Sequence, residues 1–400
     1  MKILLVSQYF YPENFKINDL IFSLKKRGHE ITVLTGKPNY SKSHFFDGYG
    51  WESDDFEIIN DIPVYRSNLI SRKNGGGLRL FLNYFSFALL ASFKLKKIKG
   101  SFEAIFVYEP SPITVGIPAV LAKRRFKAPI YFWVQDLWPE SLNAAGGVKS
   151  KLVLSFFNSL TKWIYNHSKK VLIQSDGFRE YIINQGIPNN KIVFYPNPTE
   201  DFYKPLNEEV EYQEFFQNKL FNIVFAGNIG EAQSFKTIID AINNIKSLPI
   251  KVTVLGDGRY KETAFSLIKE KRLEAHFNFL GSFPPTEMPK FFSHADALLV
   301  SLKKDKIFSL TIPAKIQSYL ACGKPIIASI DGIAAQMVKQ AECGVTAAAE
   351  SVEELETAIK HLISLDIDKR DLMAKNARSY YEKEFDRELL LEKLEKIFMS

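Results

Sequence analysis

Short apolar runs alternate with segments of helical periodicity along most of the chain. In the first half, runs suited to buried strands are separated by segments in which apolar residues recur three or four positions apart. The predicted strands are 3–7, 31–35, 104–108, 130–134 and 171–174, and the predicted helices are 15–27, 78–97, 113–125, 151–166 and 178–184. Buried strands that alternate with helices build a parallel sheet covered on both faces.

A second alternating series follows a break in the pattern. Residues 194–213, FYPNPTEDFYKPLNEEVEYQ, are rich in proline and acidic residues, which is typical of a linker. Beyond it, strands are predicted at 222–226, 251–255, 277–280, 297–300 and 325–329, helices at 235–245, 260–271, 287–292, 313–321 and 335–340, and further helix from 352 onward. The sequence therefore predicts an α/β fold with two doubly wound, Rossmann-like domains facing a cleft, and loops after strands should carry the function.

Composition supports two ordinary globular cores and an anionic partner. The chain has 400 residues, 46% of them hydrophobic, and a net charge of +7. A nucleotide or a phospholipid surface fits this charge, although a solvated basic surface fits it equally. Nucleic acid is disfavoured because the basic runs are short and lack interleaved aromatic residues. The two cysteines, Cys322 and Cys343, are expected to be reduced core residues of a cytosolic protein.

One apolar segment raises the question of a membrane. Residues 78–100, LRLFLNYFSFALLASFKLKKIKG, hold an apolar stretch too short to span a bilayer, followed by four lysines. They read either as a core helix with a basic end or as an interfacial helix against anionic lipid. The start of the chain, MKILLVSQYF, is predicted to be a first strand because its apolar run is too short for a signal peptide.

Two glycine-bearing loops follow predicted strands of the second half. IVFAGNIGEAQSF places Gly227, Asn228 and Gly230 between a strand and a helix, and VTVLGDGRY repeats this with Gly256, Gly258 and Arg259. Such loops let backbone N–H groups approach phosphate oxygens, but neither matches the dinucleotide or ATP-binding fingerprints. Each loop alone reads as a structural turn, and together they favour a nucleotide site.

A third junction strengthens that interpretation. In SLTIPAKIQSYLACGKPIIAS, residues 309–329, Thr311 is predicted as the N-cap or the residue before it, and Pro313 suits the first helical turn. A helix start can hold a phosphate. This helix carries Lys315 and Gln317 in its first turns and no carboxylate, so its own charge favours an anion.

Polar residues also follow strands of the first half. Carboxylates at the carboxyl ends of strands are candidate acids, bases or ligand anchors, although Asp136 could instead cap its own turn. The candidates are Gln135, Asp136 and Glu140 in VQDLWPES, Glu109 in VYEPSP, and Asn14, Phe15 and Lys16 in YFYPENFKIND. The six histidines are scattered without metal-ligand spacing, so no metal site is predicted.

Together these segments resemble the family 4 glycosyltransferases of the GT-B fold. The resemblance covers nearly the whole chain and is carried by KILLVSQYFYPENFKINDL, DLWPES, FAGNIGEAQSFKTIIDA and IPAKIQSYLACGKPIIAS. These motifs are similar to those of the branch that builds bacterial O-antigen and capsule, and among its members to L-fucosamine (N-acetyl-L-fucosamine) transferases.

The resemblance implies a retaining, metal-independent transfer from a UDP-sugar, with no cofactor, to a lipid-diphosphate-linked saccharide at the inner face of the plasma membrane. It implies an acceptor domain of residues 1–198 plus 385–400 and a donor domain of residues 205–384. The implied catalytic residues are Asp136, Lys315 and Glu140; those at the donor are Gly227, Asn228, Gly230, Gln233, Gly256, Gly258, Arg259, Ser309, Thr311, Ile312, Pro313 and Gln317; those at the acceptor are Asn14, Phe15, Lys16, Glu109 and Gln135.

The chain departs from the family pattern at four positions. Many relatives carry an arginine and a lysine in the first donor loop and two glutamates spaced E-x7-E, where this chain has Asn228, Gln233, Ser309 and Gln317. Lys315, the helix start and the Gly230 loop are therefore expected to hold the diphosphate. A donor lacking some hydroxyls, such as a 6-deoxy amino sugar, fits the lost glutamates. A UDP-sugar 2-epimerase of the same fold and a non-catalytic nucleotide-sugar-binding protein remain alternatives.

Overall fold

The chain divides into two compact units. The computed structural model describes residues 1–40, 44–73, 76–142, 150–206, 211–217 and 219–400. Unit 1 comprises Met1–Pro196 and Leu390–Ser400, and unit 2 comprises Asn197–Leu389. The segment predicted as a linker thus belongs to unit 2 from Asn197 onward, and its residues 207–210 lie outside the described residues.

Unit 1 is built on one eight-stranded sheet with the order β3-β4-β2-β1-β5-β6-β7-β8. All its neighbouring strands are parallel except the edge pair β3 and β4. The strands are β1 (Lys2–Ser7), β2 (Glu30–Gly36), β3 (Phe56–Ile59), β4 (Ile62–Ser67), β5 (Ala104–Glu109), β6 (Ile130–Val134), β7 (Lys170–Ile173) and β8 (Ile192–Phe194). The helices are α1 (Lys16–Lys26), α2 (Gly77–Lys94), α3 (Gly116–Phe126), α5 (Lys151–His167), α6 (Arg179–Asn184) and part of α15 (Arg387–Met399).

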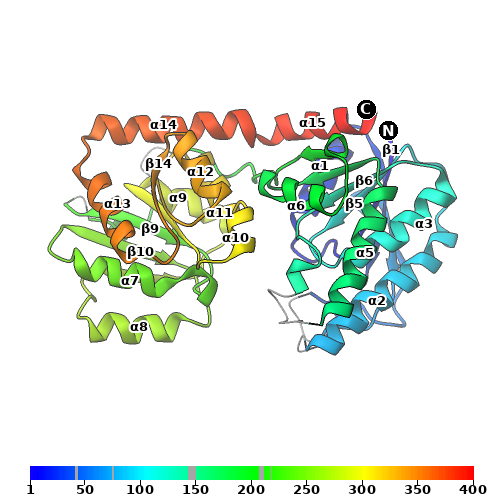
Figure 1. Ribbon diagram of the computed structural model, residues 1–400, viewed down its shortest axis with the longest axis horizontal. Helices are drawn as coiled ribbons and strands as arrows, with labels where there is room; N and C mark the ends of the chain where they lie inside the picture. Colours follow the sequence, from blue (N-terminus) through cyan, green and yellow to red (C-terminus); the bar gives the residue numbers. More distant parts are fainter. Residues whose placement is uncertain (41–43, 74–75, 143–149, 207–210, 218) are drawn as a thin grey trace. The chain divides into compact units, whose positions relative to one another are not determined.

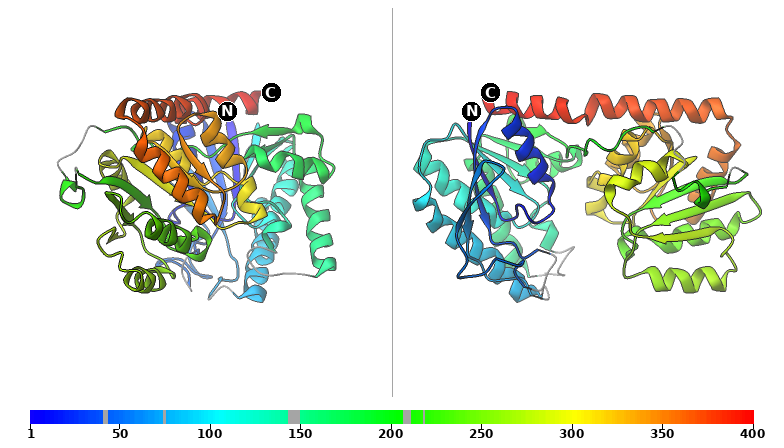
Figure 2. Two further views of the ribbon diagram at one scale, coloured as in Figure 1. Left: turned by 60° about the vertical axis from the view of Figure 1, so that its left-hand side comes forward. Right: turned by 180° about the vertical axis from the view of Figure 1, so that it is seen from behind.

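Helices cover both faces of this sheet (Figures 1 and 2). α2 packs on α3, and α3 packs on α5, which forms one layer. α1 and α15 lie on the opposite face, where they share a core with inward-facing aromatic residues of β5 and β6. The central strands are buried on both faces, which explains why their sequences are continuous apolar runs instead of alternating ones.

Unit 2 repeats this plan on a six-stranded, wholly parallel sheet with the order β11-β10-β9-β12-β13-β14. The strands are β9 (Phe221–Ala226), β10 (Ile250–Leu255), β11 (Phe277–Gly281), β12 (Ala297–Ser301), β13 (Ile326–Ser329) and β14 (Gly344–Ala347). The helices are α7 (Phe235–Asn244), α8 (Lys261–Glu270), α9 (Met288–Ser293), α10 (Lys306–Leu310), α11 (Ala314–Ala321), α12 (Ile333–Gln340), α13 (Val352–Ser364) and α14 (Ile367–Glu384). α7, α8 and α13 share the core on one face of the sheet.

Short 3₁₀ turns complete both units. They are η1 (Leu95–Lys97), η2 (Ile113–Val115), η3 (Asp176–Phe178), η4 (Asn189–Lys191), η5 (Gln213–Phe215), η6 (Glu231–Gln233) and η7 (Pro285–Glu287). Most of them lead into an α-helix or a strand, as is usual for 3₁₀ segments at element ends.

The order of the strands reverses once in each sheet. In unit 1 the reversal lies between β1 and β5, and in unit 2 it lies between β9 and β12. Connections leave such a pair of neighbouring strands toward opposite faces, which opens a crevice at their carboxyl ends where ligands of doubly wound sheets bind. The glycine loop after β9 and Glu109 at the end of β5 both lie at these points.

Several elements differ from the sequence prediction. β3, β8, β14 and α10 were not predicted, because each is too short for its periodicity to stand out. β4 was not predicted because Pro63 and Arg66 interrupt its apolar run. Thr311 was expected at the start of α11, but that helix begins at Ala314 with Pro313 as N-cap. The Thr311 hydroxyl instead donates to the Ile307 carbonyl, 2.9 Å away, and so closes the unpredicted helix α10.

The C-terminal segment of α15 is anchored to unit 1 by packing and by one carboxylate. Leu390, Leu394 and Phe398 enter the core beneath β5 and β6. Glu395 accepts hydrogen bonds from Arg27 Nε at 3.0 Å and Arg27 Nη2 at 2.8 Å, and its Oε1 lies 2.8 Å from His29 Nε2. The two Arg27 bonds, with the His29 contact, lower the pKa of Glu395 to about 2.

Glu395→Gln is expected to reduce the free energy of unfolding by about 1–3 kcal/mol near neutral pH, because charge-assisted bonds are lost. The pKa of this carboxyl is depressed on folding, so its stabilisation is present above about pH 5 and disappears as the pH falls toward 2. Urea unfolding over this pH range measures the difference. Glu392→Gln, at an exposed position of the same helix, is the control; an equal loss in both variants would contradict the anchoring role.

Candidate active site

The two glycine loops of unit 2 pack against each other. Gly227 N donates to Leu255 O at 2.7 Å, and Ile229 N donates to Asp257 O at 2.8 Å. Gly256 has φ +149°, and a Cβ there would lie 1.9 Å from the Gly227 carbonyl oxygen. Only glycine fits this position, so the two loops form one backbone surface at the carboxyl ends of β9 and β10.

Lys315 lies against this surface, and its ammonium group faces an aromatic ring. Its side chain runs past Gly227, where a Cβ would lie 2.5 Å from the lysine Cε, and its Nζ lies 3.9 Å from the centroid of the Phe225 ring. Within the described residues Nζ makes no hydrogen bond, although it is buried. Burial lowers the pKa of Lys315 to about 7. A buried lysine without a carboxylate is costly in the free protein and is suited to receive an anion.

The conformation of the first glycine loop is held by side chains of the loop itself and by the second loop. Gln233 Oε1 accepts from Gly230 N at 3.1 Å and from Asn228 Nδ2 at 3.4 Å, so these side chains hold the loop in shape. Gly258 brings the second loop close, since a Cβ on it would lie 2.3 Å from the Ile229 carbonyl oxygen. Arg259 follows directly and is exposed. Asn228 and Gln233 replace the expected cations and act here on the backbone conformation.

The junction before α11 brings the remaining donor-side residues together. Ile312 is buried and Pro313 caps the helix, which has no side-chain cap for its first N–H groups. Gln317 is buried, donates from Nε2 to Asn197 O at 3.1 Å and has an unpartnered Oε1 within the described residues. Ser309 Oγ donates to Lys306 O at 2.8 Å, so this hydroxyl is engaged in its own helix.

Two buried serines at strand ends were not among the site residues predicted from the sequence. Ser301 and Ser329 are the last residues of β12 and β13, stand in register, and are fully buried. Both hydroxyl oxygens lack a hydrogen-bond partner among the described residues. Gly332, just beyond, approaches Ser309 so closely that a Cβ would lie 1.9 Å from the Ser309 carbonyl oxygen. A serine ending an apolar strand gives little sequence signal, because serine is common at such ends.

In unit 1, two carboxylates lie at the carboxyl ends of neighbouring strands. Glu109 ends β5 and is fully buried; burial, and secondarily the charge of Asp136, raise its pKa well above the usual range. Neither Glu109 oxygen makes a hydrogen bond of good geometry within the described residues. Burial also raises the pKa of Asp136, just after β6, to about 6. Burial therefore favours the neutral form of Glu109, while Asp136 is mostly ionised above about pH 6.

The other residues predicted on the acceptor side lie in two places: near Glu109 and Asp136, and on the loop after β1. Gln135 N donates to the Glu109 carbonyl at 3.0 Å, which links the two strands. Glu140 accepts from the Tyr181 hydroxyl and so faces α6. Phe15 precedes α1 and stacks on Tyr9 with ring centroids 4.8 Å apart. Lys16 begins α1, and Asn14 is exposed just before it.

A cluster of polar and aromatic side chains beside Phe15 was not predicted from the sequence. It is composed of Gln8, Tyr9, Glu13, Asn39, Tyr40, Arg72, Asn83 and Tyr84. Glu13 Oε1 accepts from the backbone of Asn39 at 2.8 Å and of Tyr40 at 2.6 Å, and burial raises the pKa of Glu13 to about 7. These residues come from four separate segments, so no local motif indicated them.

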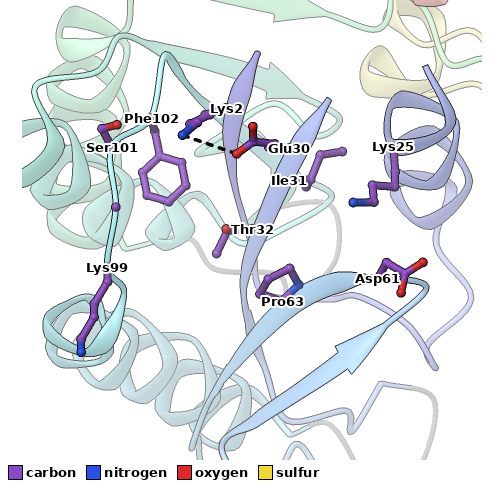
Figure 3. Close-up of a pocket in the computed structure, with 11 residues that line it drawn as sticks. Lys2, Lys25, Glu30, Ile31, Thr32, Asp61, Pro63, Lys99, Ser101 and Phe102 are labelled. Atoms are coloured by element: carbon purple, nitrogen blue, oxygen red, sulfur yellow. Dashed lines mark ion pairs between the residues drawn. The ribbon is translucent and has the colours of Figure 1, made fainter. Parts of the chain in front are cut away.

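A cavity of about 310 Å³ lies at the opposite edge of the unit 1 sheet (Figure 3). It is lined by the amino ends of β1 and β2 and by Lys99, Ser101 and Phe102, and Lys2 pairs with Glu30 at 3.5 Å. Ligands of parallel sheets bind at the carboxyl ends, so we do not place the site here. Within the described residues, no group of three or more His, Cys, Asp or Glu is arranged to hold a metal ion.

Comparison with known proteins identifies the family. Residues 206–380 match the family model "Glycosyl transferases group 1", and residues 16–198 match "Glycosyl transferase 4-like domain". The two matches together cover most of both units. The chain therefore belongs to the family 4 glycosyltransferases, and its two sheets have the architecture of the GT-B fold.

Individual relatives agree with this assignment. A protein of Escherichia coli (strain K12), named as a candidate colanic acid biosynthesis glycosyl transferase WcaI, is 23% identical over 98% of both chains. This similarity places the chain in the capsule and O-antigen branch of the family. The fold matches sucrose-phosphate synthase from Thermosynechococcus elongatus (TM-score 0.75, 15% identity, 100% and 98% of the chains). It also matches Anabaena Alr3699/HepE in complex with UDP (TM-score 0.72, 14% identity, 100% of both chains).

Lys315→Met is expected to stabilise the nucleotide-free protein. The pKa of Lys315 is lowered on folding, so the group destabilises the fold below its unfolded pKa, increasingly as the pH falls from 10 to 7. Removing the charge at similar volume should raise the unfolding temperature near pH 7 by about 4 °C. Lys324→Met is the contrast, because Lys324 Nζ donates to the Ser293 and Ala295 carbonyls and its loss should lower that temperature. Thermal unfolding without nucleotide measures both; a destabilised Lys315→Met would contradict the unpaired charge.

Proposed function

We propose that the protein transfers a sugar from a UDP-sugar to a lipid-diphosphate-linked saccharide in bacterial capsule or O-antigen synthesis, with retention of configuration and without a metal. The observation that carries this proposal is the buried, unpartnered Nζ of Lys315 against the Gly227 loop. A diphosphate placed there would meet a cation, the uncapped start of α11 and the glycine-loop backbone. HepE, which shares the fold, is a UDP complex.

The transfer step needs no oxidant and no added base. The bond between the anomeric carbon and the donor's β-phosphate oxygen breaks, and its electron pair remains on that oxygen. The acceptor hydroxyl oxygen bonds to the anomeric carbon from the same face, and its proton passes to the departing phosphate. Lys315 and the backbone N–H groups stabilise the charge that develops on the diphosphate. This chain thus supplies electrostatics and positioning, while the substrate carries the proton.

Asp136 is proposed to orient the acceptor hydroxyl or the transferred sugar. It lies half-buried at the carboxyl end of β6, next to Glu109, and is ionised above its pKa of about 6. Gln135 and Glu140 flank it, and Phe15 and Lys16 lie on the loop after β1 of the same unit. A carboxylate in this setting accepts hydrogen bonds from sugar hydroxyls.

The donor sugar is proposed to carry fewer hydroxyls than hexoses such as glucose, with N-acetyl-L-fucosamine as the candidate. Ser309 stands where relatives have a glutamate, and its hydroxyl is already engaged with Lys306 O. Gln317 offers one free amide oxygen in place of a carboxylate. The site therefore has few acceptors for sugar hydroxyls and no carboxylate at either position.

Helix α2 is proposed to dock unit 1 on an anionic membrane. Contrary to the expectation from the sequence, residues 77–97 (α2 with η1) form a helix long and apolar enough to cross a bilayer, the one such helix among the described residues. Its Asn83, Phe87 and Ala91 nevertheless face the core. Leu78, Phe81, Leu89 and Phe93 are exposed instead. Asp55 pairs with Lys94 and Lys97, so the basic end is partly neutralised, and Lys96 and Lys99 supply the attraction to lipid.

Nucleotide binding tests the donor site directly. UDP is expected to bind without metal in excess EDTA, more tightly than GDP or ADP, and Lys315→Ala should weaken it by about ten- to a hundred-fold. Binding should also take up a proton near pH 8, because Lys315 is mostly neutral in the free protein and charged beside a diphosphate. Calorimetry in buffers of different ionisation enthalpy measures both quantities.

Nucleotide binding, together with a turnover assay on the UDP-sugar with and without acceptor, distinguishes the alternatives. If no nucleotide binds, the transferase proposal fails. If UDP binds but its sugar is never transferred, a non-catalytic binding protein is indicated. Release or isomerisation of the sugar without an acceptor indicates the 2-epimerase. A preference for GDP would contradict a UDP-sugar as donor, but it would still support a diphosphate-binding site at Lys315.

Asp136→Asn is expected to lower turnover by about a hundred-fold or more without changing UDP affinity. Wild-type turnover should rise between about pH 5 and 7 as Asp136 ionises, and the variant should lose this limb. The assay follows UDP release from UDP-N-acetyl-L-fucosamine with lipid-linked saccharides extracted from bacterial membranes. Asp47→Asn, at an exposed loop position of the same unit, should keep the pH limb. Unchanged turnover in Asp136→Asn would refute its role.

A further inference from the structure

Arg72 is enclosed by three tyrosines in unit 1. Its guanidinium carbon lies 4.8 Å from the ring centroid of Tyr40 and 5.9 Å from those of Tyr9 and Tyr84. Its Nη1 donates to the Tyr9 hydroxyl at 3.2 Å. Cation–π contacts and this bond fix the plane of the guanidinium, and the described residues give no partner to most of its five N–H donors.

A chain of buried amides holds this arrangement to the sheet. The backbone N of Arg72 donates to Asn39 Oδ1 at 3.2 Å, and Asn83 Nδ2 donates to the same oxygen at 3.1 Å. Asn83 Oδ1 in turn accepts from Gln8 Nε2 at 2.7 Å, just after β1. Arg72 is therefore positioned at the switch point of the unit 1 sheet by residues whose own hydrogen bonds are mostly satisfied.

The charge of Arg72 lies close to few carboxylates. Within the part of the chain that the structure describes, no carboxylate forms an ion pair with it. The nearby acid, Glu13, is directed to the backbone N–H groups of Asn39 and Tyr40. Its pKa of about 7 keeps part of the population neutral at physiological pH. A half-buried arginine fixed in orientation and left unpaired is suited to bind an anionic group with two parallel hydrogen bonds.

The arginine lies near the proposed reaction centre of the same unit. Burial raises the pKa of Tyr84, Arg72 lowers it, and Asp136 raises it further, so the Tyr84 phenol senses both charges. Tyr40 is 41% exposed, and a sugar ring can pack against its face. An anionic group at Arg72 would thus be attached to a saccharide that reaches toward Asp136.

An aromatic path leads from this region to the exposed end of α2. Trp138, two residues after Asp136, packs on Phe157 with centroids 5.1 Å apart. Phe157 packs on Phe85 at 6.1 Å, and Phe85 packs on Phe81 at 4.3 Å. Trp138 and Phe157 are buried and Phe81 is 47% exposed, so packed aromatic rings join this region to the exposed apolar face of α2.

We infer that Arg72 binds a phosphate of the acceptor, with the guanidinium fork on its oxygens and the lipid chain directed along α2. The inference rests on the proposed function and names the group by which the acceptor is recognised. A phosphate explains the unpaired cation, and its linkage to a lipid explains why the exposed apolar side chains Leu78 and Phe81 follow Arg72 so closely in the chain.

Binding of geranyl diphosphate to protein saturated with UDP tests this inference, because UDP occupies the Lys315 site. Wild-type protein is expected to bind it at least ten-fold more tightly than geraniol. Arg72→Ala should lower the affinity for geranyl diphosphate by about ten- to a hundred-fold. Arg72→Lys keeps the charge but loses the paired N–H donors of the guanidinium, so it should lower this affinity less. Inorganic pyrophosphate should bind more weakly than geranyl diphosphate, yet also depend on Arg72.

Lys73→Gln is the matched control, because it removes one positive charge from an exposed side chain at the next position. It should leave geranyl diphosphate affinity within about two-fold, since an exposed charge is largely screened. Unchanged UDP affinity and unfolding temperature show that each variant is folded. Equal weakening by Lys73→Gln, no effect of Arg72→Ala, or no binding by wild type overturns the inference. Failure of UDP itself to bind wild-type protein refutes the proposed function and is distinguishable from all three.

Discussion

The parallel pairing of strands in two doubly wound sheets is the constraint on which the rest of this structure depends. Parallel strands all end at the same edge, and the order reverses between β1 and β5 and between β9 and β12. Each reversal gathers loops from distant parts of the chain at one edge. The glycine loops and Lys315 meet there in unit 2, and Gln8, Glu109 and Asp136 lie at that edge in unit 1. Chemistry can vary in these loops while the buried strands stay the same.

Both candidate sites contain a cation that the fold leaves uncompensated. Lys315 is buried against Phe225 without a hydrogen-bond partner among the described residues, and Arg72 is surrounded by tyrosines without an ion pair. A buried charge such as that of Lys315 lowers the stability of the free protein, and a bound anion would offset that cost. A cation without an ion pair among the described residues at each candidate site agrees with the proposed reaction, in which the donor carries a diphosphate and the acceptor a phosphate.

Much of the fold and part of the site could be predicted from the sequence. The buried runs gave β6 and nearly the full lengths of β1, β5, β9 and β12, because continuous apolar strands flanked by helices have a strong pattern. Lys315 and the Gly227 loop were singled out because both lie in local motifs. Arg72 was missed because its surroundings come from residues 9, 39–40 and 83–84, which only the sheet brings together. The lack of a partner for Lys315 is likewise a property of packing that no spacing reveals.

The last turns of α15 also determine when unit 1 can be completed. Leu390, Leu394 and Phe398 fill a core whose other walls are β1, β5, β6 and α1, which precede unit 2 in the chain. Unit 2 has all of its strands by Ala347 and lies between these two parts of unit 1 in the chain. On the ribosome, unit 2 can therefore close its core while the sheet of unit 1 still exposes the apolar face that α15 will cover. Synthesis in this order leaves that apolar face uncovered until residues 390–398 have been made.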